Sequence, residues 1–269
     1  MAFYSTIWTI KMMERREAVA GAQTVARAVN LLKHLARAGD QGLRLVDLAD
    51  ETQLARPTLH RLLKALCIQG LVTQERQSRR YRLGALVFEL GLAAAHRFNL
   101  RELSIPVLET LSRRSGDTSF LFVRSGDDVV CINRVQGDFP IQTPALPLGS
   151  RQPLGVNAGG LALLSHLPTQ EQEQLIKELA PRLEAYGEMS INELRQYCRN
   201  TRERGYAWIA NRAVPGIAAV GLPIFSANGI AIAAVTVAST QSRMTEARST
   251  TILPFLRMAS TEISGLLRQ

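Results

Sequence analysis

Cysteine is scarce in this chain of 269 residues, which contains only Cys67, Cys131 and Cys198. The three lie far apart in the sequence, without a Cys-x-x-Cys pair or a cluster of cysteine with histidine. Structural zinc sites need such clusters and disulfide frameworks need paired cysteines, so the sequence argues against both. We therefore expect no metal site and no cofactor, and a reducing cytoplasm as the setting of the protein.

Long apolar runs are also missing. No segment approaches the ~18–20 uninterrupted apolar residues that a membrane span requires, so we expect no membrane partner. Residues 1–13 are mildly apolar, but they lack the basic start of a signal peptide and lead into charged residues at 14–17. We assign residues 1–21 to an N-terminal arm with no fixed structure of its own.

The sequence lacks the motifs that mark common catalytic sites. It has no Gly-x-Ser-x-Gly nucleophile elbow, no His-Glu-x-x-His zinc motif and no Gly-x-x-x-x-Gly-Lys phosphate loop. The four histidines are scattered: His34, His60, His96 and His166. Cys131 lies in an apolar run, and the sequence reveals no base for it, so an inert core thiol is its simplest interpretation. We expect that the protein is not an enzyme.

Positive charge is concentrated in the first third of the chain. Residues 1–100 carry 15 Lys and Arg against 8 Asp and Glu, a net charge of +7. Residues 101–269 carry 17 against 15, a net charge of +2. This asymmetry is expected of a protein in which one part meets phosphates and the other does not.

Residues 56–66, with the sequence RPTLHRLLKAL, carry the most informative signal. Leu59, Leu62, Leu63 and Leu66 are spaced as one apolar face of a helix. The opposite face offers cations, a hydroxyl and an imidazole. Such a helix suits the major groove of DNA, although a solvated basic face would show the same pattern in isolation.

The neighbouring segments favour the DNA-binding interpretation. Two helices are predicted before residue 56, with apolar positions Val25, Val29, Leu32 and Leu35 in the first and Leu45, Leu48 and Ala49 in the second. Gly70 closes the third helix, and short strands at 71–74 and 81–83 enclose a basic loop. This is the order of a winged helix-turn-helix, which we place at residues 22–83. An apolar linker helix follows at residues 84–100. It packs either on its own chain or, as we expect, on the same helix of a second subunit.

From residue 101 onward the pattern is mixed. Strand-like runs at 118–125 and 129–136 flank one turn signal, and runs at 216–226 and 230–239 flank another, so both pairs predict hairpins. Helices are predicted at 103–111, 157–164, 169–179, 192–204 and 245–267. We therefore predict an α+β domain with an antiparallel sheet at residues 101–269.

The sequence resembles the IclR family of bacterial transcriptional regulators over roughly residues 24–267. The matching segments are Val25–Ala28, Leu45–Ala49, His60–Leu63, Tyr81–Gly84, Leu148–Leu154, Arg204–Ala207, Gly216–Ala219 and Pro223–Phe225. Each segment alone is weak, but their order and spacing across two domains is specific. The resemblance implies a winged helix-turn-helix, a linker helix and a GAF-like or profilin-like effector domain, in homodimers or dimers of dimers on palindromic operators.

Three positions depart from the family pattern. Gln53 stands where the turn before the recognition helix usually carries Gly, so it must adopt the backbone geometry that the turn imposes. Arg44 and Ala55 stand at helix N-caps where Ser or Thr is usual, and each forfeits roughly 1 kcal/mol of capping free energy. Pro57 fixes φ early in the third helix and compensates in part.

The predicted DNA contacts lie on the third helix and in the wing. Arg61 and Lys64 are assigned to the groove face, and Arg56 and Thr58 to phosphates at the start of the helix. Alternatively, Arg61 makes a structural bond within the domain, and the wing cations are a solvated charge run. The complete set is Arg56, Pro57, Thr58, His60, Arg61, Lys64, Arg76, Arg79, Arg80 and Tyr81.

An effector site is predicted where residues 157–160 open a helix after a proline-marked loop. Small residues let a ligand approach the backbone, and N–H groups at a helix N-terminus attract a carboxylate. Alternatively, the glycines only permit close packing of the helix on the sheet. With residues that the resemblance adds, the set is Leu146, Leu148, Asn157, Ala158, Gly159, Gly160, Ala219, Thr236 and Ala238. Arg134 and Arg151 are the candidates for a charged anchor.

The expected function is a ligand-responsive transcriptional regulator of double-stranded operator DNA, with a small organic acid or aromatic metabolite as effector. The effector would act by population shift, through the linker helix, on the spacing of two recognition helices. The alternative is a constitutive dimeric DNA-binding protein whose C-terminal domain only oligomerises. Both a repressor and an activator fit the sequence, as do a dimer and a tetramer.

Overall fold

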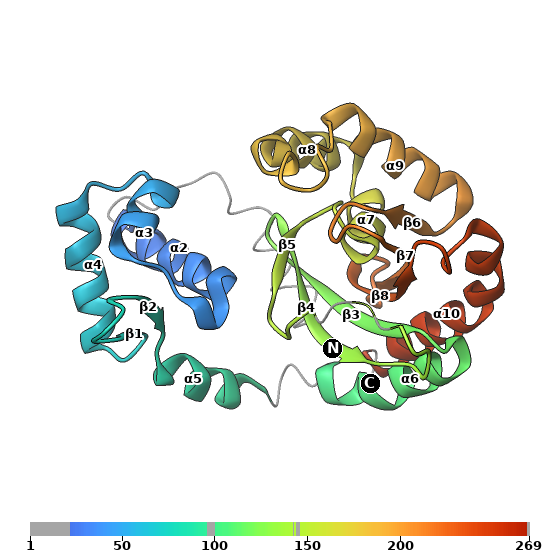
Figure 1. The fold of residues 1–269 in the computed structure, drawn as a ribbon, viewed down its shortest axis with the longest axis horizontal. Helices are drawn as coiled ribbons and strands as arrows, with labels where there is room; N and C mark the ends of the chain where they lie inside the picture. Colours follow the sequence, from blue (N-terminus) through green and yellow to red (C-terminus); the bar gives the residue numbers. More distant parts are fainter. Residues whose placement is uncertain (1–21, 96–99, 142, 144–145, 268–269) are drawn as a thin grey trace. The chain divides into compact units, whose positions relative to one another are not determined.

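The computed structural model describes residues 22–95, 100–141, 143 and 146–267. The chain forms two compact units that divide between residues 99 and 100 (Figure 1). The arm predicted at residues 1–21 and positions 96–99 of the predicted linker lie outside the described residues. Within those residues, no helix combines the length and the apolar character that crossing a bilayer requires.

The elements of the first unit follow the order of a winged helix-turn-helix. They are α2 (Gln23–Ala38), the 3-10 helix η2 (Gly39–Gln41), α3 (Leu45–Thr52), α4 (Arg56–Ile68), β1 (Val72–Gln74), β2 (Tyr81–Leu83) and α5 (Ala85–Ala95). β1 and β2 pair antiparallel to form the wing, and Leu43 pairs with Tyr81 beside it. Gly70 follows α4 with a φ of 72°, as predicted for a glycine that closes a helix.

Leucines from three helices form the core of the first unit. Leu35 of α2, Leu48 of α3 and Leu63 of α4 are at most 1% exposed. The prediction that Val25 and Val29 share this buried face is wrong, because their side chains are 64% and 45% exposed. Only the C-terminal half of α2 contributes fully buried leucines to the core, so its first turns leave an apolar surface uncovered.

The turn between α3 and α4 begins with a left-handed residue. Gln53 has φ 55° and ψ 23°, its N–H donates to Ala49 O at 2.9 Å, and its Nε2 donates to Asp50 O at 2.7 Å. Gln53 therefore adopts a conformation that usually favours glycine, as the departure from the family pattern predicted. Arg44 offers no side-chain acceptor as N-cap of α3, but its N–H donates to Asp47 Oδ2 at 2.9 Å. This bond recovers half of a capping box.

Replacing Gln53 with Gly should stabilise the first unit by up to about 1 kcal/mol, because a left-handed residue with a Cβ atom carries a strain of roughly 1–2 kcal/mol. Gln53→Ala is the matched control, since it shortens the side chain but keeps the Cβ atom. Thermal unfolding of the full chain measures both variants. A melting temperature for Gln53→Gly that is no higher than that of Gln53→Ala would show that the turn is not strained.

The second unit is built on a six-stranded antiparallel sheet with the strand order β5-β4-β3-β8-β7-β6. Its elements are α6 (Leu100–Ser115), β3 (Thr118–Ser125), β4 (Asp128–Val135), β5 (Arg151–Pro153), α7 (Ala158–Ser165), α8 (Thr169–Leu183), α9 (Ile191–Arg204), β6 (Ala207–Ala210), β7 (Ile217–Phe225), β8 (Ala231–Thr240) and α10 (Glu246–Leu266). Both predicted hairpins are present, as β3–β4 and β7–β8. The predicted α+β fold is confirmed, whereas the edge strand β6 was not predicted.

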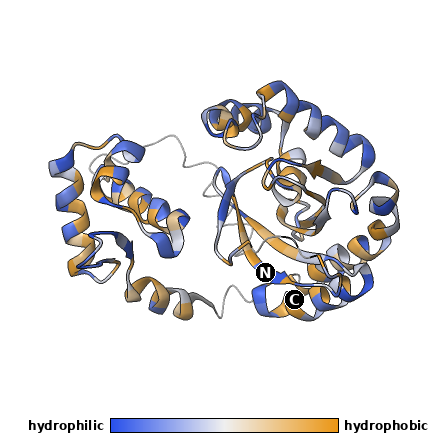
Figure 2. Cartoon of the chain, in the orientation of Figure 1, coloured by the Kyte–Doolittle hydropathy of each residue, from blue (hydrophilic) through white to orange (hydrophobic). Residues whose placement is uncertain are grey.

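The two faces of the sheet carry different helices (Figure 1). α6 and α10 pack on one face, around a core that includes Leu108, Val235 and Leu256. α7 packs on the other face with α8 and α9 beside it, around a core that includes Leu161 and Leu194. Figure 2 shows β3 and β4 of this sheet as largely hydrophobic, whereas the short edge strand β5 is hydrophilic.

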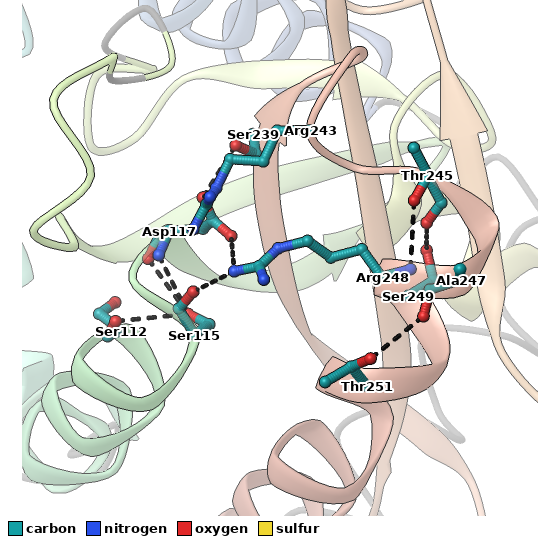
Figure 3. A network of polar contacts seen from close by, with 10 residues as sticks. All are labelled: Ser112, Ser115, Asp117, Ser239, Arg243, Thr245, Ala247, Arg248, Ser249 and Thr251. Carbon is teal, nitrogen blue, oxygen red and sulfur yellow. Dashed lines mark hydrogen bonds and ion pairs between the residues drawn. The ribbon is translucent and has the colours of Figure 1, made fainter.

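A buried ion-pair network joins the end of α6 to the start of α10 (Figure 3). Asp117 is 2% exposed and accepts from Arg243 Nε at 2.7 Å, Ser239 Oγ at 2.8 Å and the Arg248 guanidinium at 3.1 Å. Arg248 also donates to Ser115 O at 2.6 Å. Breaking a buried ion pair by removing one partner typically costs about 3–5 kcal/mol, so this network fixes the two helices to each other.

Candidate functional site

One side of α4 is exposed and cationic. The predicted contacts on this side are Arg56, Pro57, His60, Arg61 and Lys64, with Thr58 half-buried at the margin. The leucines on the opposite side are buried in the core. In the part of the chain that the structure describes, no hydrogen bond or ion pair engages the side chain of Arg61 or Lys64. The alternative that Arg61 makes a structural bond therefore finds no partner there.

The wing is ordered by a glutamate. Glu75 N–H donates to Arg80 O at 2.9 Å, and Arg79 N–H donates to Glu75 O at 3.0 Å. The Glu75 carboxylate also accepts from Ser78 Oγ and pairs with Arg82 at 3.3 Å. The hydrogen bond from Ser78 and the charge of Arg82 lower the pKa of Glu75. The loop is thus closed by its own acidic residue, and among the described residues the side chains of Arg76 and Arg79 have no hydrogen-bond or ion-pair partner.

The four residues of the wing that were predicted to contact DNA differ in their exposure to solvent. Arg76 and Arg79 are exposed in the loop between the strands. Arg80 is half-buried, and its guanidinium donates to Gly42 O at 2.9 Å, so it braces the wing against the preceding loop. Tyr81 is 6% exposed and packs in the leucine core. We correct the assignment of its side chain to the DNA contacts, because alternation along β2 directs it inward.

The second unit contains a pocket that is partly open to solvent and has a cavity volume of about 70 Å³. That volume is several times the roughly 10–15 Å³ that a single water molecule needs on the same measure. The walls come from β3, β7, β8, the start of α7 and the turn between β6 and β7. The lining residues are Phe120, Phe122, Thr143, Leu146, Gln152, Val156, Asn157, Ala158, Ile209, Arg212, Ala213, Val214, Ile217, Ala219, Thr236 and Ala238.

Most of the predicted effector residues meet at this pocket: Leu146, Asn157, Ala158, Ala219, Thr236 and Ala238. Leu148 does not line it and is 48% exposed. Gly159 and Gly160 are buried inside α7 instead. The structure therefore places six of the nine predicted residues together and three of them elsewhere.

Gly159 and Gly160 serve packing, which corrects their assignment to the effector site. A Cβ atom at 159 would lie 2.5 Å from Phe122 Cδ2, and one at 160 would lie 3.0 Å from Gly155 N. The Gly160 N–H also donates to Asn157 Oδ1 at 2.7 Å, so the helix cap uses this donor. Of the two interpretations of these glycines, close approach of helix and sheet is the one that fits.

The charged residue of the pocket is Arg212, and the two predicted anchors are corrected. Arg151 does not line the pocket, because it pairs with Asp128 at 3.3 Å and donates to Ser125 O at 3.1 Å. Arg134 is not a lining residue either. Arg212 lies in the turn after β6, a strand that the sequence did not reveal, so no local signal linked it to the site.

Two buried polar atoms of the pocket residues have no hydrogen-bond partner among the described residues: Thr143 Oγ1 and Arg212 Nε. Thr143 is 6% exposed. A buried polar group without a partner costs about 1–3 kcal/mol, so each such group in a native protein requires an explanation. A bound polar ligand would supply the missing partner.

Two family models match the chain. The model of the IclR helix-turn-helix domain matches residues 24–76, and that of the bacterial transcriptional regulator IclR C-terminal domain matches residues 92–265. The second match alone covers well over half of the chain. The chain belongs to the IclR family.

Curated relatives of this IclR-family chain are named transcriptional regulators. BhcR of Paracoccus denitrificans is 28% identical over 91% of this chain and 87% of its own length. SauR of Cupriavidus necator is 30% identical over 88% of this chain and 94% of its own length. The helix-turn-helix and the effector-domain match therefore make this chain a transcriptional regulator with a DNA-binding and a ligand-binding part.

Solved IclR-family structures share its fold. The regulator from Alicyclobacillus acidocaldarius has a TM-score of 0.73 at 24% identity, over 91% of this chain and 98% of its own. An IclR homologue from Microbacterium hydrocarbonoxydans, crystallised in complex with 4-hydroxybenzoate, has a TM-score of 0.67 at 22% identity, over 91% and 98%. At these identities the likeness shows the fold alone.

The two buried thiols of this IclR-family chain, Cys131 and Cys198, are unreactive. Burial raises the pKa of Cys131 and of Cys198 to about 11, so both are protonated at neutral pH. A reactive cysteine needs a thiolate, which neither residue provides. Among the described residues, His, Cys, Asp and Glu side chains form no group that fits a metal ion.

Gly159→Ala should destabilise the second unit by about 1–3 kcal/mol, because the added methyl group collides with the Phe122 ring in a packed core. In an exposed helix the same change stabilises by up to about 1 kcal/mol. Gly265→Ala in α10, in the same unit, is therefore the control, since a Cβ atom there meets nothing within 4 Å. Thermal unfolding compares the two variants. A melting temperature for Gly159→Ala at or above wild type would contradict the packing role.

Proposed function

We propose that this chain is a ligand-responsive regulator that binds double-stranded operator DNA through residues 22–83 and senses a small organic acid or aromatic metabolite through residues 101–269. One observation carries the proposal: an unpaired cationic helix face and a largely apolar pocket with unpaired polar atoms occur in the same chain. A domain that serves only to oligomerise needs no such pocket. We place the protein in the reducing cytoplasm.

The DNA contacts divide between α4 and the wing. Arg61 and Lys64 contact bases, because arginine or lysine to guanine is the commonest specific contact in the major groove. Arg56 and Thr58 at the start of α4, and Arg76 and Arg79 in the wing, contact phosphates. These phosphate contacts fix the register of α4 in the groove.

A second copy of the chain covers the apolar surface of α5, within the linker that we place at residues 84–100. Phe88 is 68% exposed, and Leu90 and Leu92 are each 55% exposed. Neighbouring exposed apolar side chains of this size usually mark an interface. Two-fold pairing through α5 would present two copies of α4 to a palindromic operator, as a homodimer or within a dimer of dimers.

The effector is proposed to bind in the pocket on the α7 face of the sheet. Phe120, Phe122, Ile209 and Ile217 give it apolar walls that suit an aromatic ring or a short aliphatic chain. The complex of the Microbacterium hydrocarbonoxydans homologue with 4-hydroxybenzoate supports an aromatic acid as one candidate.

The double variant Arg61→Ala with Lys64→Ala should lose roughly 100-fold or more in operator affinity, since each good base contact is worth about 1–3 kcal/mol. The operator fragment is selected from random DNA by the wild-type protein, and binding is measured by fluorescence anisotropy at two salt concentrations. Arg113→Ala in α6 removes the same kind of exposed charge outside the first unit and should bind as wild type. An unchanged affinity of the double variant would remove α4 from the interface.

A metabolite that binds the pocket should both raise the melting temperature and change operator affinity. Thermal-shift screening of the full chain against small carboxylic acids and aromatic catabolites identifies such compounds, and anisotropy with the selected operator tests each one. Ligands that stabilise the protein without moving operator affinity would favour a constitutive DNA-binding protein. The Gly159→Ala variant should lose the thermal shift, because its clash lies at the pocket residue Phe122.

A further inference from the structure

The polar side chains of the pocket are dominated by hydrogen-bond donors. Its lining includes neither Asp nor Glu, and among the described residues its charged side chain is that of Arg212. The remaining polar side chains that line it are Thr143, Gln152, Asn157 and Thr236. Which of their atoms are free depends on the hydrogen bonds that they already make.

Asn157 and Gln152 form a pair with a fixed orientation. Asn157 Oδ1 accepts from Gly160 N–H at 2.7 Å, so its amide nitrogen must point away from the helix. That nitrogen, Nδ2, donates to Gln152 Oε1 at 2.6 Å. The acceptors of both amides are thus engaged, and the Nε2 group of Gln152 is left as a donor.

Arg212 is held from outside the pocket. Its two terminal nitrogens donate to Gly187 O, in the connection between α8 and α9, and to Glu193 of α9. The turn that carries Arg212 is itself closed, because Gly216 N–H donates to Asn211 Oδ1 at 2.7 Å. Nε is the one guanidinium nitrogen that is buried without a partner among the described residues.

The second unpaired atom belongs to a nearly fully buried side chain. Thr143 is 6% exposed, it lines the same pocket, and its Oγ1 has no partner among the described residues. Arg212 Nε and Thr143 Oγ1 are therefore two donors without a partner among the described residues, in a site that otherwise has mainly apolar walls, and Arg212 is held in place before a ligand binds. Donors that are fixed before binding lose little entropy when the ligand arrives.

We propose that Arg212 Nε and Thr143 Oγ1 anchor the carboxylate of a monocarboxylic acid whose apolar body lies against Phe120 and Phe122. This inference rests on the proposed function, because it names the chemistry of the effector in the same pocket. A carboxylate matches a charged donor together with a hydroxyl, since its two oxygens accept several hydrogen bonds and carry the charge that Arg212 favours.

The pocket is poorly suited to other polar ligands. A phosphate or a dicarboxylate would bring two negative charges to a site whose one cation, Arg212, is already paired with Glu193, and the apolar walls would not solvate the second charge. A neutral amide matches the shape of the acid but cannot form a charge-assisted bond with Arg212. The acid and its amide are therefore the pair of ligands that isolates the role of the charge.

Isothermal titration calorimetry of the full-length protein with two matched pairs tests the anchor. The pairs are benzoate with benzamide, and 3-methylbutanoate with 3-methylbutanamide. At least one acid should bind the wild-type protein about 10- to 100-fold more tightly than its amide, as expected for a charge-assisted hydrogen bond. Arg212→Gln should abolish this preference and leave the affinity for the amide within about twofold of wild type.

A second variant and a control complete the experiment. Thr143→Val keeps the shape of the side chain and should weaken binding of the acid by about 3- to 10-fold. Arg195→Gln is the control, because Arg195 likewise pairs with a glutamate, Glu173 at 2.9 Å, but does not line the pocket. It should preserve the preference for the acid.

Equal affinities of acid and amide in the wild-type protein would overturn the anchor, as would an acid preference that survives in Arg212→Gln. If Arg212→Gln lowers the melting temperature, the test rests on Thr143→Val instead. An affinity of Thr143→Val for the acid that equals that of the wild-type protein would then overturn the proposal. Failure of the proposed function looks different: no compound of either charge binds, and none changes operator affinity.

Discussion

The close approach of α7 to the centre of the sheet is the constraint on which the second unit depends. All residues of this short helix are buried. Two glycines allow the contact, because a Cβ atom at 159 would meet the Phe122 ring at 2.5 Å and one at 221 would meet Ala158 O at 2.9 Å. Since Asn157 and Ala158 at the start of α7 line the pocket, the contact that closes the core also positions one wall of the pocket.

Several arginines of the second unit differ from the cations of α4 in their partners. In the second unit, arginines bind acidic partners that are distant in sequence: Arg124 pairs with Glu171 at 2.7 Å and Arg182 with Asp128 at 2.5 Å. On α4, the exposed cations have no such partner among the described residues. Part of the excess of Lys and Arg in the first third is thus exposed on α4, where it suits a polyanion.

Local chemistry made much of the fold predictable from the sequence. Leucine spacing defined α4, and the turn residues around Gly126 and Gly229 defined both hairpins, because each signal is contained within a few residues. The fold of β6 depends instead on pairing with β7, and four residues are too few to show an alternating pattern. The direction of side chains was also hard to predict. Tyr81 follows a basic loop and was therefore predicted to contact DNA, but its position in β2 directs its side chain into the core.

The pocket was predictable only in part for the same reason. Asn157 and Ala158 could be predicted because they form a recognisable helix start, whereas Ala219, Thr236 and Ala238 were predicted from the family resemblance. Arg212 reaches the pocket from a turn that no local pattern marks, and Arg151, although close to the loop in sequence, is taken by Asp128. Partners distant in sequence decide which arginine faces a ligand, and spacing along one chain does not contain that information.

The sheet separates the pocket from the layer of α6 and α10, which Asp117 ties together through Arg243 and Arg248. Side chains on opposite faces of a strand alternate, so a substitution at one position alters one face and leaves the other nearly unchanged. Ligand preference can therefore drift during evolution by exchange of pocket residues, while the clamped helices on the far side retain their geometry. Such a division lets one scaffold serve many metabolites without rebuilding its frame.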